Sequence, residues 1–186
     1  NGLKSSIRMI DLINDLLNVA RIEEGRFGLH FKQQSLTPLI EKILERIQKR
    51  ADEKGIILVR NISSTLPLLK IDEEKMNIAI ENVLDNAIKY TAPAGKVTIN
   101  VSPVKGGVKL VIMDTGIGIP KDQLPRIFTK FFRADNALRF QTSGSGLGLY
   151  VVRNVIERHN GTVIITSEEE RGTTVTIILP IKDQQN

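Results

Sequence analysis

The sequence predicts an α/β fold: a two-layer sandwich with helices on one face of a mixed, mostly antiparallel sheet, preceded by a separate bundle-forming helix. Three observations support it. Stretches with apolar residues three and four apart indicate helices, shorter apolar or alternating runs indicate strands, and both kinds are interspersed along 186 residues. A chain of this length can bury one core, so we expect one domain at 26–186 and the separate helix at 1–25.

The first 25 residues carry the apolar repeat of a coiled coil or four-helix bundle. One stripe, here called the seam, consists of Leu3, Ser6, Ile10, Ile13, Leu17 and Ala20, widened by Ile7 and Leu16. Gly25, after two glutamates, should end the helix. A single helix cannot bury the seam, so we expect a partner, either a missing helix of this chain or a second copy. The alternative is packing on the domain that follows.

The domain itself reads as strands and helices in alternation. Thr37 should be the N-cap of its first helix, with Pro38 at the first helical position. Asp72 should cap the second helix, and the third is expected at 147–157. The expected strands are 26–32, 56–60, 97–101, 108–113, 162–167 and 173–179. Residues 115–146 are rich in Gly, Pro, Lys and Arg and are too long for an ordinary connection, which predicts a functional loop or lid.

Composition narrows the classes of function. The chain has no cysteine and no apolar run near the roughly 20 residues that a membrane span needs. Its net charge of +5 favours anionic partners, but only 4% of residues are aromatic and none alternates with a basic stripe, which argues against nucleic acid. We expect a reducing, cytoplasmic location. Because the sequence starts within a helical pattern, we also expect a longer protein whose membrane or sensing parts could lie upstream.

The second helix of the domain carries two asparagines on one polar stripe. Asn82 and Asn86 are four residues apart, and Lys89 and Tyr90 follow one turn later. Amide oxygens are hard, neutral ligands suited to a Mg²⁺ ion that already carries phosphates, and Lys89 could neutralise phosphate charge. The alternative is an ordinary solvated polar face.

A second motif, DTGIGIP, begins at Asp114 directly after a hydrophobic strand. A carboxylate at a strand end can accept a hydrogen bond from the amino group of adenine, and Gly116 and Gly118 let the backbone approach the ring. A hydroxyl at Thr173, where the last strand begins, could join such a network. The alternative is an ordinary Asp-Gly turn.

Two further motifs lie within the expected lid and at its end. Gly144, Gly146 and Gly148 directly precede or open the third helix, where free backbone N–H groups and the helix dipole form a phosphate site. Their spacing differs from the dinucleotide-binding fingerprint, and the Gly-Lys-Ser/Thr of a P-loop is missing. Upstream, IFTKFFR places three phenylalanines beside Lys130 and Arg133, either as an anchor that swings both cations toward phosphates or as a small satellite core.

In order and spacing, these four motifs resemble the N, G1, F and G2 boxes of sensor histidine kinases. The resemblance covers residues 35–180, and residues 1–25 look like the second helix of the family's dimerisation and histidine-phosphotransfer hairpin. It implies the Bergerat ATP-binding fold, ATP and Mg²⁺ as cofactors, and transfer of the γ-phosphoryl group to a histidine of the hairpin. The full-length protein would then be a homodimer that relays the phosphoryl group to an aspartate of a response regulator receiver domain.

The same resemblance implies roles for individual residues. Asp114 would hold adenine, while Asn86 and Asn82 would hold Mg²⁺. The residues implied to contact phosphates are Lys89, Lys130 and Arg133, with Asn82, Lys130 and Arg133 as the catalytic set. The other implied nucleotide-binding residues are Tyr90, Gly116, Gly118, Ile119, Gly144, Gly146, Leu147, Gly148 and Thr173. The family's phosphoacceptor motif, a His followed by an acidic residue and soon by Pro, is missing, so we expect His30 and His159 to be structural.

Other functions stay open at this point. Hydrolytic relatives of the same fold, such as type II topoisomerase, mismatch-repair and heat-shock chaperone ATPases, place a water-activating glutamate four residues before the magnesium asparagine. This chain has Asn82 there, and Glu81 lies about 100° round the helix. A serine kinase of the same superfamily would leave the seam unexplained. A nucleotide-responsive module without catalysis is disfavoured by the retained Asp, Asn, Lys and Gly set.

Overall fold

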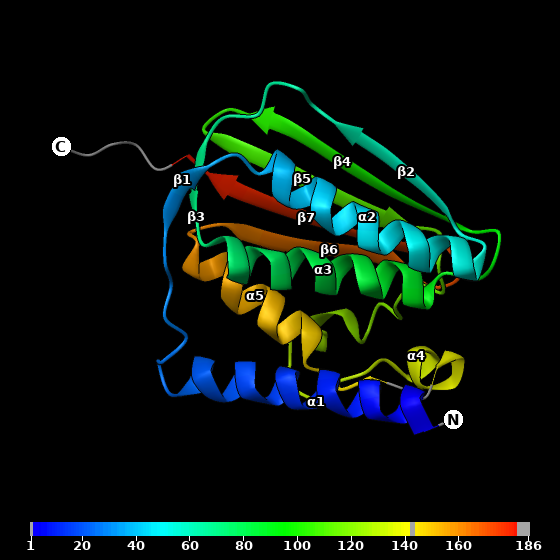
Figure 1. Ribbon diagram of the computed structural model, residues 1–186. Coiled ribbons are helices and arrows are strands. Elements are labelled where there is room, and N and C mark those ends of the chain that lie inside the picture. The colour runs from blue at the N-terminus through cyan, green and yellow to red at the C-terminus, as the bar shows by residue number, and fades with distance from the viewer. Residues whose placement is uncertain (1, 142–143, 182–186) are drawn as a thin grey trace.

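The computed structural model describes residues 2–141 and 144–181 (Figure 1). Its helices are α1 (Gly2–Glu23), α2 (Thr37–Lys54), α3 (Glu73–Tyr90), α4 (Asp135–Phe140), α5 (Gly148–Arg158) and the short 3-10 helix η1 (Leu124–Arg126). Its strands are β1 (Lys32–Gln34), β2 (Ile57–Ile62), β3 (Leu69–Ile71), β4 (Lys96–Val104), β5 (Gly107–Asp114), β6 (Thr162–Glu168) and β7 (Gly172–Pro180).

Five strands form one mixed sheet in the order β2-β4-β5-β7-β6. Among the described strands, only β2 and β4 pair in parallel, and α3 lies in the crossover between them. Buried residues alternate along the central strands, so one face of the sheet points to the core while Thr98, Val111 and Thr176 lie on the other. Helices α2, α3 and α5 cover the core face (Figure 1). The predicted two-layer α/β sandwich is therefore confirmed.

A second sheet of two short strands was not predicted. The strand expected at 26–32 is wrong: β1 begins only at Lys32 and pairs antiparallel with β3, so that Lys32 lies opposite Ile71 and Gln34 opposite Leu69. Residues 27–31 have no regular structure, but Phe27 is buried in the core and the backbone N–H of His30 donates to Asp72 at 2.6 Å. Side-chain packing and one carboxylate therefore hold this segment without a strand.

Local capping explains how two helices begin. Asp72 is the N-cap of α3 as predicted, and its Oδ1 accepts a 2.9 Å hydrogen bond from Lys75 N–H. For α2 the prediction is displaced by one residue, since Leu36 is the N-cap and makes no side-chain capping bond. Pro38 still lies in the first turn, where its missing N–H costs nothing.

Helix α1 packs against α5, on the side of the domain away from α2 (Figure 1). Val19 and Ile22 are buried in the domain core, so part of the helix does pack on the domain that follows. The seam residues Ile10, Ile13 and Leu17 are instead exposed by about half, and Ala20 is exposed too. The side chains of Leu3, Ser6 and Ile7 lie outside the described part. Among the helices formed by the described residues, none is long and apolar enough to cross a bilayer.

The expected lid contains more structure than its sequence indicates. Within 115–146 the chain forms η1 and the single-turn helix α4, and Asn136 Nδ2 donates to the carbonyl of Gly118 at 2.9 Å. The side chains of Gln123 and Asp135 join η1 to α4 at 2.8 Å. Residues 142 and 143 lie outside the described part, so the expected lid is known here up to 141 and from 144 onward.

Candidate nucleotide-binding site

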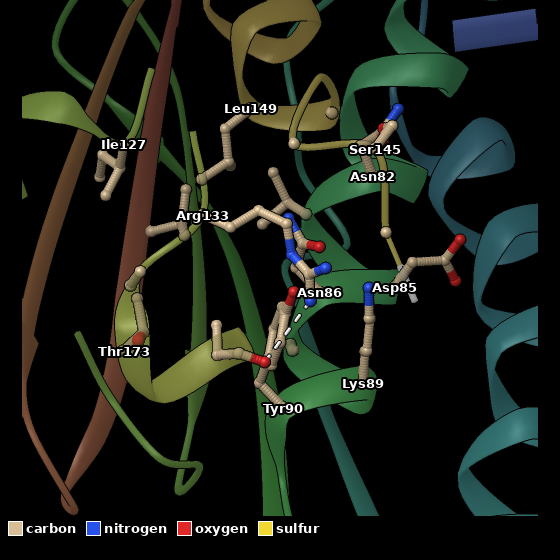
Figure 2. A pocket seen from close by; sticks show the side chains of 18 of the residues that line it. Asn82, Asp85, Asn86, Lys89, Tyr90, Ile127, Arg133, Ser145, Leu149 and Thr173 are labelled. Carbon is tan, nitrogen blue, oxygen red and sulfur yellow. Dashed lines mark hydrogen bonds between the residues drawn. The ribbon is translucent and has the colours of Figure 1, made fainter. Parts of the chain in front are cut away.

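The motif residues meet around a cavity of about 960 Å³ between α3, the sheet and the lid. This volume lies within the range of small-molecule sites. The predicted site residues that line it are Asn82, Asn86, Lys89, Tyr90, Asp114, Gly118, Ile119, Arg133, Gly144, Gly146, Gly148 and Thr173. Figure 2 shows Asn82, Asn86 and Lys89 along α3, with Thr173 across the pocket. Gly116, Leu147 and Lys130 lie outside the lining.

Asp114 lies at the end of β5, half-buried in the cavity wall. Its Oδ1 accepts hydrogen bonds from the backbone N–H groups of Gly116 at 2.9 Å and Thr173 at 3.2 Å. Burial raises the pKa of this carboxyl to about 6, and the two backbone hydrogen bonds oppose that rise. One oxygen is thus fixed by the fold, and in the described part of the chain no donor engages the other.

The backbone around Asp114 is packed too tightly for side chains. A Cβ at Gly116 would lie 2.8 Å from Asp114 Oδ1, which explains the glycine even though Gly116 does not line the cavity. Gly118 has φ +65° and contacts the backbone of Glu168, where another residue would also be strained. Because these two glycines have no side chain, the loop can pack closely beside the carboxylate.

Ser167 completes this network and was missed by sequence reasoning. Its hydroxyl accepts from Ile119 N–H at 2.9 Å, donates to the Gly172 carbonyl at 2.8 Å and lies 2.9 Å from the Thr173 hydroxyl. Ser167 and Thr173 are directly opposed in the β6–β7 register. Only that register could have found Ser167, because nothing in its local sequence marks it.

The two asparagines of α3 both line the cavity. Asn82 Nδ2 donates to the Ile78 carbonyl at 2.9 Å, which turns its Oδ1 outward, to within 2.5 Å of where a Cβ at Gly148 would lie. The described residues contain no cluster of three or more His, Cys, Asp or Glu that could hold a metal. A Mg²⁺ ion here would rely on Asn86 and Asn82 amide oxygens, water and phosphate oxygens, which suits this ion.

The glycine-rich segment before α5 lies beside the end of α3. Gly144 and Gly146 both have positive φ, at 143° and 71°. A Cβ at Gly144 would lie 2.5 Å from Lys89 Nζ, so this glycine lets the ammonium reach the segment. Ser145 accepts a hydrogen bond from Leu147 N–H at 3.2 Å, and Leu147, buried in the core, is the N-cap of α5. The helix N-terminus and one cation therefore face the same part of the cavity.

The structure separates the two cations of the lid. Arg133 extends into the cavity toward Asn86, and its guanidinium donates to the Gln141 carbonyl (Figure 2). Lys130 does not line the cavity: it forms an ion pair with Glu23 of α1 and lies 5.6 Å from the centre of the Tyr150 ring. The hydrogen bond to Glu23 raises the pKa of the Lys130 ammonium. The predicted phosphate contact of Lys130 would require it to leave Glu23.

Helix α1 also contributes to the cavity, which sequence reasoning did not indicate. Leu12, Asn14, Asp15 and Asn18 all line it. Asp15 Oδ2 accepts a 2.6 Å hydrogen bond from the Ser145 hydroxyl. These residues lie between the seam positions, so an apolar repeat gives no sign of their role.

Comparison with known proteins places this geometry in a family. Residues 71–183 match the family described as histidine kinase-, DNA gyrase B- and HSP90-like ATPases. Over 96% of its length the chain is 31% identical to the sensor histidine kinase WalK of Bacillus subtilis (strain 168) and 32% identical to the sensor protein SrrB of Staphylococcus aureus (strain NCTC 8325 / PS 47). It spans only 29% and 30% of those two proteins.

Solved structures give the same result. Full-length ShkA in complex with AMPPNP superposes with a TM-score of 0.81 at 31% identity, covering 95% of this chain and 36% of that one. The mycobacterial sensor histidine kinase MprB superposes with a TM-score of 0.69 at 31% identity, covering 82% of this chain and 97% of that one.

Proposed function

The chain belongs to the histidine kinase-, DNA gyrase B- and HSP90-like ATPases, as a histidine kinase catalytic ATP-binding domain, and from this we propose its reaction. It binds Mg-ATP in the cavity and transfers the γ-phosphoryl group to a histidine of a dimerisation hairpin in the full-length homodimer. A response regulator receiver domain then accepts the phosphoryl group. The site belongs to the cytoplasmic part of such a sensor.

The observation that carries the proposal is the position of Asp114. One carboxylate oxygen is held by two backbone N–H groups, and the other can accept a hydrogen bond from an exocyclic amino group. The cavity wall beside it is apolar and suited to a flat ring, being formed by Ile112, Ile119, Ile165 and Val175. An acceptor beside an apolar wall fits the exocyclic amino group of adenine, whereas guanine carries a carbonyl at that position of the ring.

The triphosphate would lie toward α3 and the N-terminus of α5. Asn86 and Asn82 would hold Mg²⁺, and Lys89 and Arg133 would neutralise phosphate oxygens. Phosphoryl transfer has a loose transition state, so positioning and charge neutralisation are the main contributions that the protein must make. The incoming imidazole needs no general base, since its unperturbed pKa of about 6.5 leaves it largely neutral near pH 7.

Hydrolysis of ATP by this chain should be slow. Hydrolytic relatives need a glutamate where this chain has Asn82 to activate water. The neighbouring Glu81 cannot replace it, because its carboxylate accepts hydrogen bonds from Arg46 and Asn77, both at 3.2 Å. The site therefore favours a better nucleophile than water, such as a histidine presented by a partner.

The acceptor histidine should lie on another segment. The ring of His159 is buried and engaged at both nitrogens, by Asp72 N–H at 3.0 Å and by the Val155 carbonyl at 2.7 Å. His30 lacks the acceptor motif. The exposed seam residues Ile10, Ile13 and Leu17 supply an apolar surface on which the rest of a four-helix bundle could assemble.

The test is to incubate the chain with radiolabelled ATP, with and without an added dimerisation hairpin. When both are present, we expect acid-labile label on the hairpin and not on the chain, and no label when the hairpin lacks its histidine. Asn86→Ala should abolish labelling because Mg²⁺ loses a ligand. Label on His30 or His159 of the isolated chain, at the rate of the hairpin reaction, would contradict the proposal.

A further inference from the structure

Helix α1 presents a second face, distinct from the seam, to the lid. Asp15, Val19 and Glu23 are spaced by four residues, so they lie close to one line along the helix. Val19 is buried against the domain, and the two carboxylates stand at either side of it. We call this the acidic face of α1.

Each carboxylate of the acidic face holds one donor of the nucleotide motifs. Asp15 accepts from the hydroxyl of Ser145, within the glycine-rich segment, at 2.6 Å. Glu23 forms an ion pair with Lys130 in the phenylalanine-rich segment. The backbone carbonyl of Ile22 adds a 3.4 Å hydrogen bond from Arg158 of α5. These contacts join residues more than 100 positions apart, so together with the buried Val19 and Ile22 they hold α1 on the domain.

A carboxylate offers these donors what a phosphate would offer, namely negatively charged oxygen acceptors. Ser145 lines the cavity beside the N-terminus of α5, and Lys130, which lies outside the lining, comes three residues before Arg133, which does line it. While the Ser145 hydroxyl donates to Asp15 and the Lys130 ammonium pairs with Glu23, neither group can donate to a bound phosphate. Asp15 also lines the cavity, where its charge would repel a triphosphate.

We propose that the acidic face of α1 is a latch that competes with nucleotide phosphates for Ser145 and Lys130. In the nucleotide-free domain Asp15 and Glu23 hold both donors, and α1 stays docked. Binding of Mg-ATP takes the donors and releases the helix, while docking of the helix weakens nucleotide binding by the same factor, because such coupling is reciprocal. The hairpin is thus freed to present its histidine when the site is loaded. This inference rests on the proposed function, in that the cavity must hold a nucleoside triphosphate.

The first test compares Mg-ATP affinity by titration calorimetry in the chain and in the double variant Asp15→Asn, Glu23→Gln. We expect binding about threefold to tenfold tighter in the double variant, the size of effect that one part-buried and one exposed polar contact can exert together. Glu24→Gln is the control: it removes one carboxylate charge next to Glu23, where within the described residues the Glu24 carboxylate pairs with Arg26 at the surface, and it should leave affinity unchanged. Unchanged or weaker binding in the double variant would overturn the latch alone, whereas failure of every variant to bind would overturn the proposed function with it.

The second test uses the absence of cysteine from the chain. Asp15→Cys with Ser145→Cys places two thiols where the native side chains hydrogen-bond. We expect an intramolecular disulfide under mild oxidation, its formation slowed at least severalfold by Mg-ATP but not by Mg²⁺ alone. The oxidised form should bind Mg-ATP more weakly than the reduced form, with recovery on reduction. Disulfide formation at the same rate with and without Mg-ATP would show that the helix does not respond to nucleotide.

Discussion

The backbone N–H of Thr173 donates a 3.2 Å hydrogen bond to Asp114 Oδ1, which joins the start of β7 to the end of β5. These two strands are neighbours in the sheet, with Met113 opposite Thr174. The sheet register therefore fixes the carboxylate before any ligand arrives. Little reorganisation would be needed to bind adenine, which is the condition for a strong, specific polar contact.

Asp114→Asn should weaken Mg-ATP binding about tenfold to a hundredfold, measured by titration calorimetry. The amide can still accept from Gly116 and Thr173 through its oxygen, but its NH₂ group would then meet the amino group of adenine, donor against donor. A hydrogen bond to a charged group contributes roughly 1.5 to 3 kcal/mol, which sets the expected range. Asp122→Asn, at an exposed position of the lid, serves as the control. Equal affinity in both variants would exclude Asp114 as the adenine acceptor.

The same substitution should increase stability without nucleotide, in a pH-dependent way. Burial raises the pKa of Asp114 from 3.8 to about 6, so folding favours its protonated form. The stabilisation from this group is complete below about pH 4 and is lost as pH rises through about 6. The unfolding free energy of Asp114→Asn should therefore exceed that of the wild type by an amount that grows from pH 4 to pH 7, up to about 3 kcal/mol. Urea denaturation at both pH values measures it, and a difference independent of pH would contradict the assignment.

Local patterns predicted the features that depend on residues close in sequence. Asp114 at a strand end and the asparagine pair on α3 needed only periodicity and spacing. The three-residue strands β1 and β3 could not be found, because they are too short to show alternation and they depend on each other across 35 or more residues.

The contacts of α1 and of Ser167 could not be predicted from the sequence either, because they also depend on segments far apart in the chain. Val19 and Ile22 are apolar positions beside the seam, and only the position of α5 decides that they are buried. Ser167 acts through its register with Thr173. Lys130 was predicted from its segment to contact phosphate, and its ion pair with Glu23 could not be read from either local sequence.

Gly148→Ala should impair phosphoryl transfer to the hairpin by about tenfold. The added Cβ would lie 2.5 Å from Asn82 Oδ1, and Asn82 cannot simply rotate away without losing its hydrogen bond to the Ile78 carbonyl. Overpacking of this kind costs roughly 1 to 3 kcal/mol. Alanine is a better helix former than glycine, and Gly148 lies in the first turn of α5, so helix propensity alone would favour the variant. Any loss of activity would therefore come from the contact between the new Cβ and Asn82.

The control for Gly148→Ala is Gly28→Ala, since nothing lies within 4 Å of a Cβ at Gly28. Labelling rates with the hairpin at saturating and subsaturating ATP distinguish loss of binding from loss of transfer. Normal rates in Gly148→Ala would show that the contact between Asn82 and α5 has no part in the reaction.

His159→Ala should destabilise the domain but should not remove the phosphoryl acceptor. Asp72 N–H donates to Nε2, and the Val155 carbonyl can only accept, so the ring is the neutral tautomer with its proton on Nδ1. The ring also packs edge-on against Phe31, 5.1 Å between centroids, which joins the segment before β1 to the end of α5. Losing a buried ring and two hydrogen bonds should lower the unfolding free energy by about 3 to 5 kcal/mol in urea denaturation. His30→Ala, at an exposed side chain, should change it by less than about 0.5 kcal/mol. At a temperature where both variants remain folded, each should still label the hairpin at the wild-type rate, and loss of label from folded His159→Ala would mean that this histidine takes part in the transfer.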